Sequence, residues 1–182
     1  MIVSVIILFV LLLLFYLGFL LKIKTGLVKV KFDQKSFENN EFISVIVPFR
    51  NESKTILENL KCLENQNISK DRYEVIYIND QSDDDSPAKL QSAISKSNFS
   101  VYSVGTIEYE KAHKKYAIEL GLEKSKGKII LFTDADCVNE PTWISSMIMK
   151  FSSDTGLVSG PVRFASDNSL FAKLQQLEFA GL

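Results

Sequence analysis

The pattern of hydrophobic and polar positions changes twice along the chain. Residues 2–21 form an apolar run without a charge, and residues 31–41 are mostly polar. From residue 43 onward, short apolar runs rich in β-branched residues alternate with stretches of helical periodicity. The first run is long enough for a helix to cross a hydrocarbon layer. The later alternation is typical of parallel βαβ units.

The alternating region predicts a three-layer α/β domain. Its apolar runs are nearly continuous, as expected for strands covered on both faces. The predicted strands occupy residues 43–48, 73–79, 99–104, 128–133 and 157–161. The expected fold class is therefore α/β, with a Rossmann-like, mostly parallel sheet flanked by helices and preceded by one transmembrane helix.

Start and stop signals mark four helices between these strands. Ser53 is a candidate N-cap for the first helix, and Ser86-Pro87 can open the second. Gly127 signals the end of the third, and Pro141 opens the fourth. From Asn168 onward, apolar residues again recur at helical spacing, which predicts a helix on the domain or at the membrane surface.

The flanks of the first apolar run predict its orientation. No basic segment or small-residue cleavage site accompanies it, so an anchor is favoured over a cleaved signal peptide. Lysines follow the run and none precedes it, which places the rest of the chain on the cytoplasmic side. We expect a single-pass transmembrane helix at residues 1–22, a connector at 23–42 and one domain at 43–182.

Composition excludes several classes of function. The net charge of -1, with both signs interspersed, gives no basic surface for nucleic acid. Cys62 and Cys137 lack zinc-ligand spacing and are interpreted as reduced thiols. The single histidine, His113, and the lack of a nucleophile-elbow motif give a hydrolytic triad no support; we expect His113 on the surface or at a site rim. Dinucleotide and P-loop motifs are also missing.

Polar clusters follow three predicted strands, where ligands bind in open α/β sheets. The first cluster contains Pro48, Arg50 and Glu52, and the second contains Asp80. The fourth strand is followed by Asp134-Ala135-Asp136. We expect these clusters to converge on one crevice at the carboxyl edge of the sheet.

Asp134 and Asp136 are separated by one small residue, so an extended loop can direct both carboxylates towards one cation. Such hard oxygen ligands suit Mg²⁺ or Mn²⁺, which keep positions open for phosphate oxygens. The alternative is a pair of solvated or helix-capping acids. The position after a buried strand favours metal binding.

Asp80 and Lys114 can each be interpreted as a ligand-binding residue or as a residue with only a structural or solvated role. Asp80 could accept a hydrogen bond from the imide of a uracil-like base, while Arg50 or Glu52 contacts the base or ribose. Alternatively, Asp80 belongs to an Asx turn before a helix. Lys114 begins a predicted helix, where a lysine opposes the helix dipole. A nearby phosphate would explain it, and simple solvation is the alternative.

Four blocks follow one another within residues 43–182, and they read ISVIVPFRNES, EVIYINDQSDDDS, HKKYAIELGLEKSKGKIILFTDADC and GLVSGPVRF. Together and in this order they strongly resemble family 2 inverting glycosyltransferases of the GT-A fold. The resemblance implies a nucleotide-sugar donor, commonly a UDP-sugar, with Asp80 at the base and Lys114 near the diphosphate. It also implies a metal held by Asp134 and Asp136. Membrane anchoring suggests a glycan or lipid-linked acceptor.

This chain departs from the family pattern at three positions, and it has no residue that matches the family's catalytic base. The family often has two acids and a glycine where Asn79, Asp80 and Gln81 stand, and a glycine where His113 stands. Its catalytic base, which deprotonates the acceptor, comes from a segment matched by no residue up to Leu182. We therefore expect a truncated chain that binds donor but transfers sugar poorly.

Two rival readings remain. A nucleotidyltransferase would carry a glycine-rich basic loop after the first strand, whereas this chain has PFRNES there. A catalytically incompetent membrane scaffold would keep the fold but show no metal-dependent nucleotide binding.

Overall fold

The computed structural model describes residues 2–29, 41–105, 113–152, 154–162, 169, 172 and 173. The chain divides into two units. Residues 36–158 form one of them, and residues 1–35 together with 159–182 form the other. The predicted domain boundaries at residues 22 and 42 stay a prediction.

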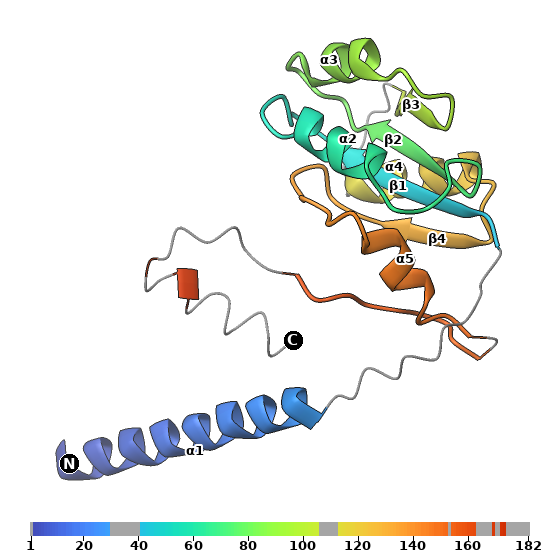
Figure 1. Ribbon diagram of the computed structural model, residues 1–182. Coiled ribbons are helices and arrows are strands. Elements are labelled where there is room, and N and C mark those ends of the chain that lie inside the picture. Colours follow the sequence, from blue (N-terminus) through green and yellow to red (C-terminus); the bar gives the residue numbers. More distant parts are fainter. Residues whose placement is uncertain are drawn as a thin grey trace. The chain divides into compact units, whose positions relative to one another are not determined.

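The N-terminal helix, α1, covers Ile2–Lys29 (Figure 1). An 18-residue stretch within Ile2–Gly26 has a mean hydropathy of 3.0, and none of that stretch is buried. By length and composition, α1 can cross a membrane.

A four-stranded parallel sheet forms the centre of the unit made of residues 36–158 (Figure 1). Its strands are β1 (Ile43–Phe49), β2 (Tyr73–Asn79), β3 (Phe99–Ser103) and β4 (Ile129–Phe132). Their spatial order is β3-β2-β1-β4. The two central strands are almost entirely buried, which explains their continuous apolar sequences.

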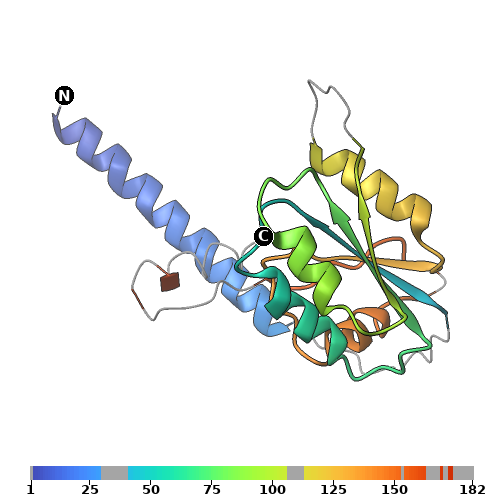
Figure 2. The same cartoon turned by 90° about the horizontal axis from the view of Figure 1, so that it is seen from above.

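Helices cover both faces of the sheet (Figure 2). They are α2 (Ile56–Glu64), α3 (Ser86–Ala93), α4 (His113–Lys124) and α5 (Trp143–Ile148). Buried side chains of α2, α3 and α5 share one core with the odd-numbered residues of β1. The opposite core joins Ile46, Ile76 and Ile78 to Ala117 of α4. These layers confirm the predicted three-layer α/β architecture.

Four of the five predicted strands are present, each within one residue of its predicted ends. The fifth prediction, residues 157–161, is wrong: this stretch forms neither strand nor helix. Leu157 is 86% exposed, so its apolar side chain does not enter a core. A strand also needs a neighbour for its hydrogen bonds, and no described strand pairs with this stretch.

Two predicted helix caps are also wrong. The N-cap position of α2 is occupied by Thr55, two residues after Ser53, and that of α3 by Asp85. The Ser53 hydroxyl instead donates to Asp85. Pro141 lies just before α5, as predicted. The helix predicted from Asn168 onward falls mostly outside the described residues.

The sheet order places a topological switch point between β1 and β4. The chain first moves from β1 to β2 and β3 on one side, then crosses to β4 on the other. In such sheets the two connections leave in opposite directions, so a crevice opens at the carboxyl ends of the diverging strands. The carboxyl edge beside β1 and β4 is therefore where the fold predicts a ligand.

Candidate functional site

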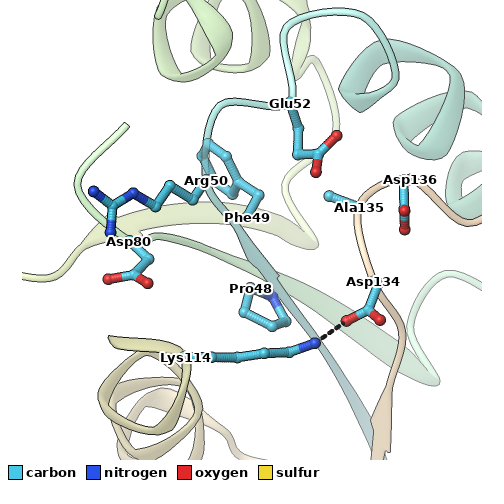
Figure 3. Close-up of a pocket in the computed structure, with 9 residues that line it drawn as sticks. All are labelled: Pro48, Phe49, Arg50, Glu52, Asp80, Lys114, Asp134, Ala135 and Asp136. Carbon is cyan, nitrogen blue, oxygen red and sulfur yellow. Dashed lines mark hydrogen bonds and ion pairs between the residues drawn. The ribbon is translucent and has the colours of Figure 1, made fainter. Parts of the chain in front are cut away.

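A pocket lies at this carboxyl edge, and it collects all the site residues predicted from the sequence (Figure 3). The loops after β1, β2 and β4 contribute to it, together with the first turn of α4. The predicted residues in its walls are Pro48, Arg50, Glu52, Asp80, Lys114, Asp134 and Asp136. Phe49 and Ala135, which were not predicted, complete the lining.

Pro48 lies in a central strand, where a proline normally removes a ladder hydrogen bond. Here the Ile46 carbonyl accepts from the Thr133 amide at 3.3 Å on the β4 side, and the Phe49 carbonyl accepts from Asp80 at 2.8 Å on the β2 side. Because backbone groups alternate along a strand, the nitrogen of Pro48 faces the β4 side, as the Ile46 carbonyl does. The pairing of β1 with β4 has already ended there, since the last paired residue of β4 is Phe132. No ladder bond is lost, and the gap between β1 and β4 starts here.

The two acids of the Asp134–Asp136 segment face outward because the residue between them faces inward. Ala135 is only 3% exposed and belongs to the core beneath α2 and α5, whereas both aspartates are exposed. Figure 3 shows both carboxylates on the same side of the pocket. No cluster of three or more metal-binding side chains occurs among the described residues. Two carboxylates still fit Mg²⁺ or Mn²⁺, which usually take further ligands from water and phosphate.

Lys114 forms an ion pair with Asp134, with its Nζ atom 2.6 Å from Oδ1. The side chains are 63% and 54% exposed, so solvent screens the pair. Exposed ion pairs contribute about 0–1 kcal/mol. Lys114 can therefore leave Asp134 for a stronger anionic partner at little cost.

Arg50 and Asp80 lie together at the opposite end of the pocket (Figure 3). Asp80 is 6% exposed, and its backbone amide is fixed by the bond to Phe49. Arg50 is exposed. The Glu52 carboxylate accepts a hydrogen bond from the Thr55 hydroxyl at 2.7 Å, which orients it at the start of α2. The pocket thus has one end lined by Arg50 and Asp80 and another by Lys114 and the paired aspartates.

The loops after β1 and β2 are held together by a set of hydrogen bonds that the sequence did not predict. The Asn51 amide donates to the Ser82 hydroxyl at 3.0 Å, and the Asp83 amide donates back to the Asn51 side chain at 2.7 Å. The Ser53 amide donates to Asp84 at 3.0 Å. These bonds fix the backbone on both sides of Arg50 and Glu52 relative to the β2 loop.

Asp84 and Asp85 take part in this set of hydrogen bonds as carboxylates. A hydrogen bond from the Ser86 hydroxyl is the main cause that lowers the pKa of Asp84, and one from Ser53 lowers the pKa of Asp85. The Ser86 amide also donates to Asp84 at 3.0 Å, which is an Asx turn. Asp84 thus forms an Asx turn before α3, and Asp80 lines the pocket.

Cys137 and His113 are direct sequence neighbours of the pocket residues Asp136 and Lys114. Cys137 is a free, partly buried thiol whose burial raises its pKa, so it is mainly protonated at neutral pH. This is unsuited to a nucleophile. His113 begins α4, and its side chain, predicted to lie on the surface or at the site rim, falls outside the described part of the structure.

Fold and pocket together define a Rossmann-like three-layer α/β domain with its polar pocket at the switch point. Residues 44–180 match the family model described as Glycosyl transferase family 2. The chain therefore belongs to that family, and its fold is GT-A.

Curated relatives agree with this assignment. The chain is 30% identical over 129 residues to the glycosyltransferase AglE of Haloferax volcanii, covering 70% of this chain and 41% of the relative. It is 28% identical over 137 residues to the undecaprenyl-phosphate 4-deoxy-4-formamido-L-arabinose transferase of Shewanella sediminis, covering 75% of this chain and 41% of that protein. The chain spans about two fifths of the length of these relatives.

Two solved structures resemble this chain. S. aureus TarS 1-349 in complex with UDP-GlcNAc aligns with a TM-score of 0.51 and 27% identity, covering 58% of this chain and 29% of that one. The mannosyltransferase PcManGT of Pyrobaculum calidifontis, in complex with GDP-Man and Mn²⁺, aligns with a TM-score of 0.60 and 21% identity. That alignment covers 73% of this chain and 39% of the mannosyltransferase. The PcManGT similarity supports the fold alone.

Proposed function

We propose that this pocket binds a nucleotide-diphosphate sugar, with UDP as the preferred nucleotide, through Mg²⁺ or Mn²⁺. In the whole protein the sugar is transferred to an acceptor hydroxyl with inversion. The observation that carries the proposal is the meeting of Asp80, Lys114, Asp134 and Asp136 in one pocket of a family 2 chain. TarS, a structural relative, was solved with UDP-GlcNAc, which supports the choice of UDP.

The base and ribose bind at the end of the pocket lined by Arg50 and Asp80. A carboxylate accepts the imide N–H of uracil, and Asp80 is held at this end by its backbone bond to Phe49. Arg50 and Glu52 contact the base or ribose from the β1 loop. Because Asp80 is almost fully buried, a nucleobase that offers it no N–H would leave a carboxylate facing an unsuitable surface.

The diphosphate binds at the other end, between Lys114 and the paired aspartates. Asp134 and Asp136 would hold the divalent cation, which when bound neutralises charge on the departing diphosphate. Lys114 exchanges its exposed ion pair with Asp134 for a phosphate oxygen. This exchange also frees Asp134 for the cation, so nucleotide and metal favour each other's binding.

The reaction is a single in-line displacement at the anomeric carbon. It requires a general base for the acceptor hydroxyl, and we place this base beyond Leu182, because no residue up to there matches the family's catalytic carboxylate. Residues 1–182 accordingly bind donor and transfer sugar poorly. The aligned stretch covers only 41% of each of these two relatives, which leaves room for such a segment in a whole protein.

The acceptor is a lipid-linked or envelope glycan at the membrane. The α1 helix can span the bilayer, and one relative is named for transfer involving undecaprenyl-phosphate. Lys22 and Lys24 follow the apolar run, so we place the domain on the cytoplasmic side. Cytoplasmic nucleotide sugars would then reach the pocket directly.

Isothermal titration of UDP into the 182-residue chain in detergent micelles tests the donor site. We expect binding with Mn²⁺ and little binding with EDTA. Asp136→Asn should abolish the metal dependence, whereas Asp154→Asn, an exposed aspartate outside the pocket, should not. Lys114→Ala should weaken binding roughly tenfold or more, since a charge-assisted hydrogen bond is worth about 1.5–3 kcal/mol, whereas its exposed neighbour variant Lys115→Ala should bind normally.

Equal effects of Lys114→Ala and Lys115→Ala would contradict the proposed phosphate contact. Absence of binding by a folded wild-type chain would contradict the donor site and favour the scaffold reading.

A further inference from the structure

Asn59 is a polar residue in the apolar stripe of α2. It is 1% exposed, and the neighbouring positions of that stripe, Ile56, Leu60 and Leu63, are all buried in the core. A buried amide is costly unless its hydrogen bonds are satisfied, so its partners indicate its role.

The partners of Asn59 lie at both ends of the segment that carries the paired aspartates. Its Nδ2 atom donates to the Asp134 carbonyl at 3.2 Å and to the Cys137 carbonyl at 2.8 Å. Its Oδ1 atom accepts from the hydroxyl of Tyr77, a buried residue of β2, at 2.9 Å. Backbone carbonyls only accept, so the amide nitrogen must face the segment and the oxygen must face Tyr77.

This arrangement restrains a single turn. The Cys137 amide donates to the Asp134 carbonyl at 3.2 Å, which closes the segment on itself. Asn59 then fixes both of its ends to α2, while the buried side chain of Ala135 fixes its middle. The carboxylates of Asp134 and Asp136 project from a backbone that is held at three points.

We infer that Asn59 is a positioning residue for the metal-binding carboxylates, with Tyr77 orienting its amide. The inference rests on the proposed function for the metal role of Asp134 and Asp136. Asn59 itself lies outside the pocket lining, so it acts through the backbone of the segment. Residues that orient metal ligands typically affect metal affinity 10- to 100-fold, because a displaced ligand loses its geometry.

Gln66 provides a matched control, since it is a second buried amide that binds the same stretch of chain farther from the acids. Its Nε2 atom donates to the Glu140 carbonyl at 2.9 Å, and its Oε1 atom accepts from the Ile144 amide at 3.0 Å. Gln66 thus ties down the start of α5 as Asn59 ties down the aspartate segment. A variant at Gln66 measures the effect of losing a buried amide alone.

The test compares Asn59→Leu and Gln66→Met, which remove each amide at similar side-chain volume, in the full chain in detergent. Mn²⁺-dependent UDP affinity is measured at a temperature where each variant remains folded, and hydrogen exchange is followed across residues 134–137. We expect Asn59→Leu to weaken binding about tenfold or more and to speed exchange at Cys137. Gln66→Met should leave both nearly unchanged.

Tyr77→Phe is a milder probe that retains the buried ring. It should shift affinity and exchange in the same direction as Asn59→Leu, but less, because the two Asn59 donors remain. It also covers the case in which Asn59→Leu does not fold.

Equal losses of affinity in the Asn59 and Gln66 variants, or normal exchange at Cys137 in Asn59→Leu, would overturn the inference. If the wild-type chain fails to bind UDP, the proposed function fails. The exchange data still decide the role of Asn59: selective loss of protection in Asn59→Leu supports it, and unchanged protection overturns it.

Discussion

Asn51 and Gln81 hold left-handed backbone conformations beside the pocket, with φ values of 57° and 55°. Asparagine tolerates this conformation well, whereas the Cβ atom of most residues meets a carbonyl oxygen there. Gln81 directly follows Asp80, so its conformation sets the direction in which the chain leaves the end of the pocket lined by Arg50 and Asp80. The family's frequent glycine at this position has a physical reason, since glycine adopts positive φ without steric cost.

Gln81→Gly should therefore stabilise the fold slightly or leave it unchanged. Relief of a left-handed side chain gains about 1–2 kcal/mol, while the greater freedom of glycine in the unfolded chain costs about 0.4–1 kcal/mol. The exposed bond from Gln81 to the Gly105 carbonyl is also lost. We expect a net gain of about 0.5 kcal/mol in urea unfolding monitored by circular dichroism.

Gln91→Gly supplies the control, because Gln91 is an exposed residue within α3. The same substitution there should destabilise by about 1 kcal/mol. If both variants lose the same stability, the left-handed conformation of Gln81 carries no significant strain.

At the residue scale, the sequence predicted the residues that line the pocket but not the buried residues that hold them in place. The pocket residues could be predicted because they follow strand ends or begin a helix, and such positions converge at one edge of the sheet. Asp80, Lys114 and Asp134 are examples. Asn59 had a visible signal, a polar side chain within an apolar helical stripe, but its partners are 75 and 78 residues away. Tyr77 resembles any other buried strand residue until its hydroxyl partner is known.

Among the elements, the loop between α4 and β4 makes a close backbone contact with the start of β1 at Gly127. An added Cβ atom there would lie 2.7 Å from the Ile43 carbonyl carbon and 2.8 Å from Ser44 Oγ, and closer still to the Ser44 nitrogen. The Gly127 amide donates to Ser44 Oγ at 2.8 Å, and Ser44 donates to Glu74 at 2.7 Å. Gly127 was predicted to end the helix, but α4 ends at Lys124 and no described glycine has a positive φ.

Gly127→Ala should destabilise the domain by about 1–3 kcal/mol, because overpacking against backbone cannot be relieved by a rotamer change. Gly156→Ala is the control, since no atom lies within 4 Å of its added Cβ. It should be neutral or slightly stabilising in the same thermal or urea unfolding. A neutral Gly127→Ala would show that the loop before β4 can move away from β1.

Elements differed in how well the sequence predicted them. The central strands are rich in β-branched residues and buried on both faces, so pattern and structure agree. Helix starts were less predictable because the hydroxyls of Ser53 and Ser86 donate to aspartates of the loop after β2 and do not cap the helices. The run at residues 157–161 had the apolar composition of a strand but no described partner, and pairing is a property that local sequence does not contain.

At the scale of the whole molecule, a family 2 domain follows a helix that is long and apolar enough to cross a membrane. One pocket brings Asp80, Lys114, Asp134 and Asp136 together, and we propose that it binds the base and the diphosphate of the donor. The aligned stretch of the chain covers 41% of each of two curated relatives. The proposal therefore separates donor binding, within residues 1–182, from acceptor activation, which we assign to further residues of a longer protein.

A crystal structure of the chain with UDP and Mn²⁺ would test this account most directly. We predict that the metal lies between the carboxylates of Asp134 and Asp136 and that the uracil lies beside Asp80. A diphosphate oxygen should contact Lys114 in place of its present ion pair with Asp134. A nucleotide bound elsewhere, or a metal that contacts neither aspartate while Lys114 keeps its bond to Asp134, would contradict it.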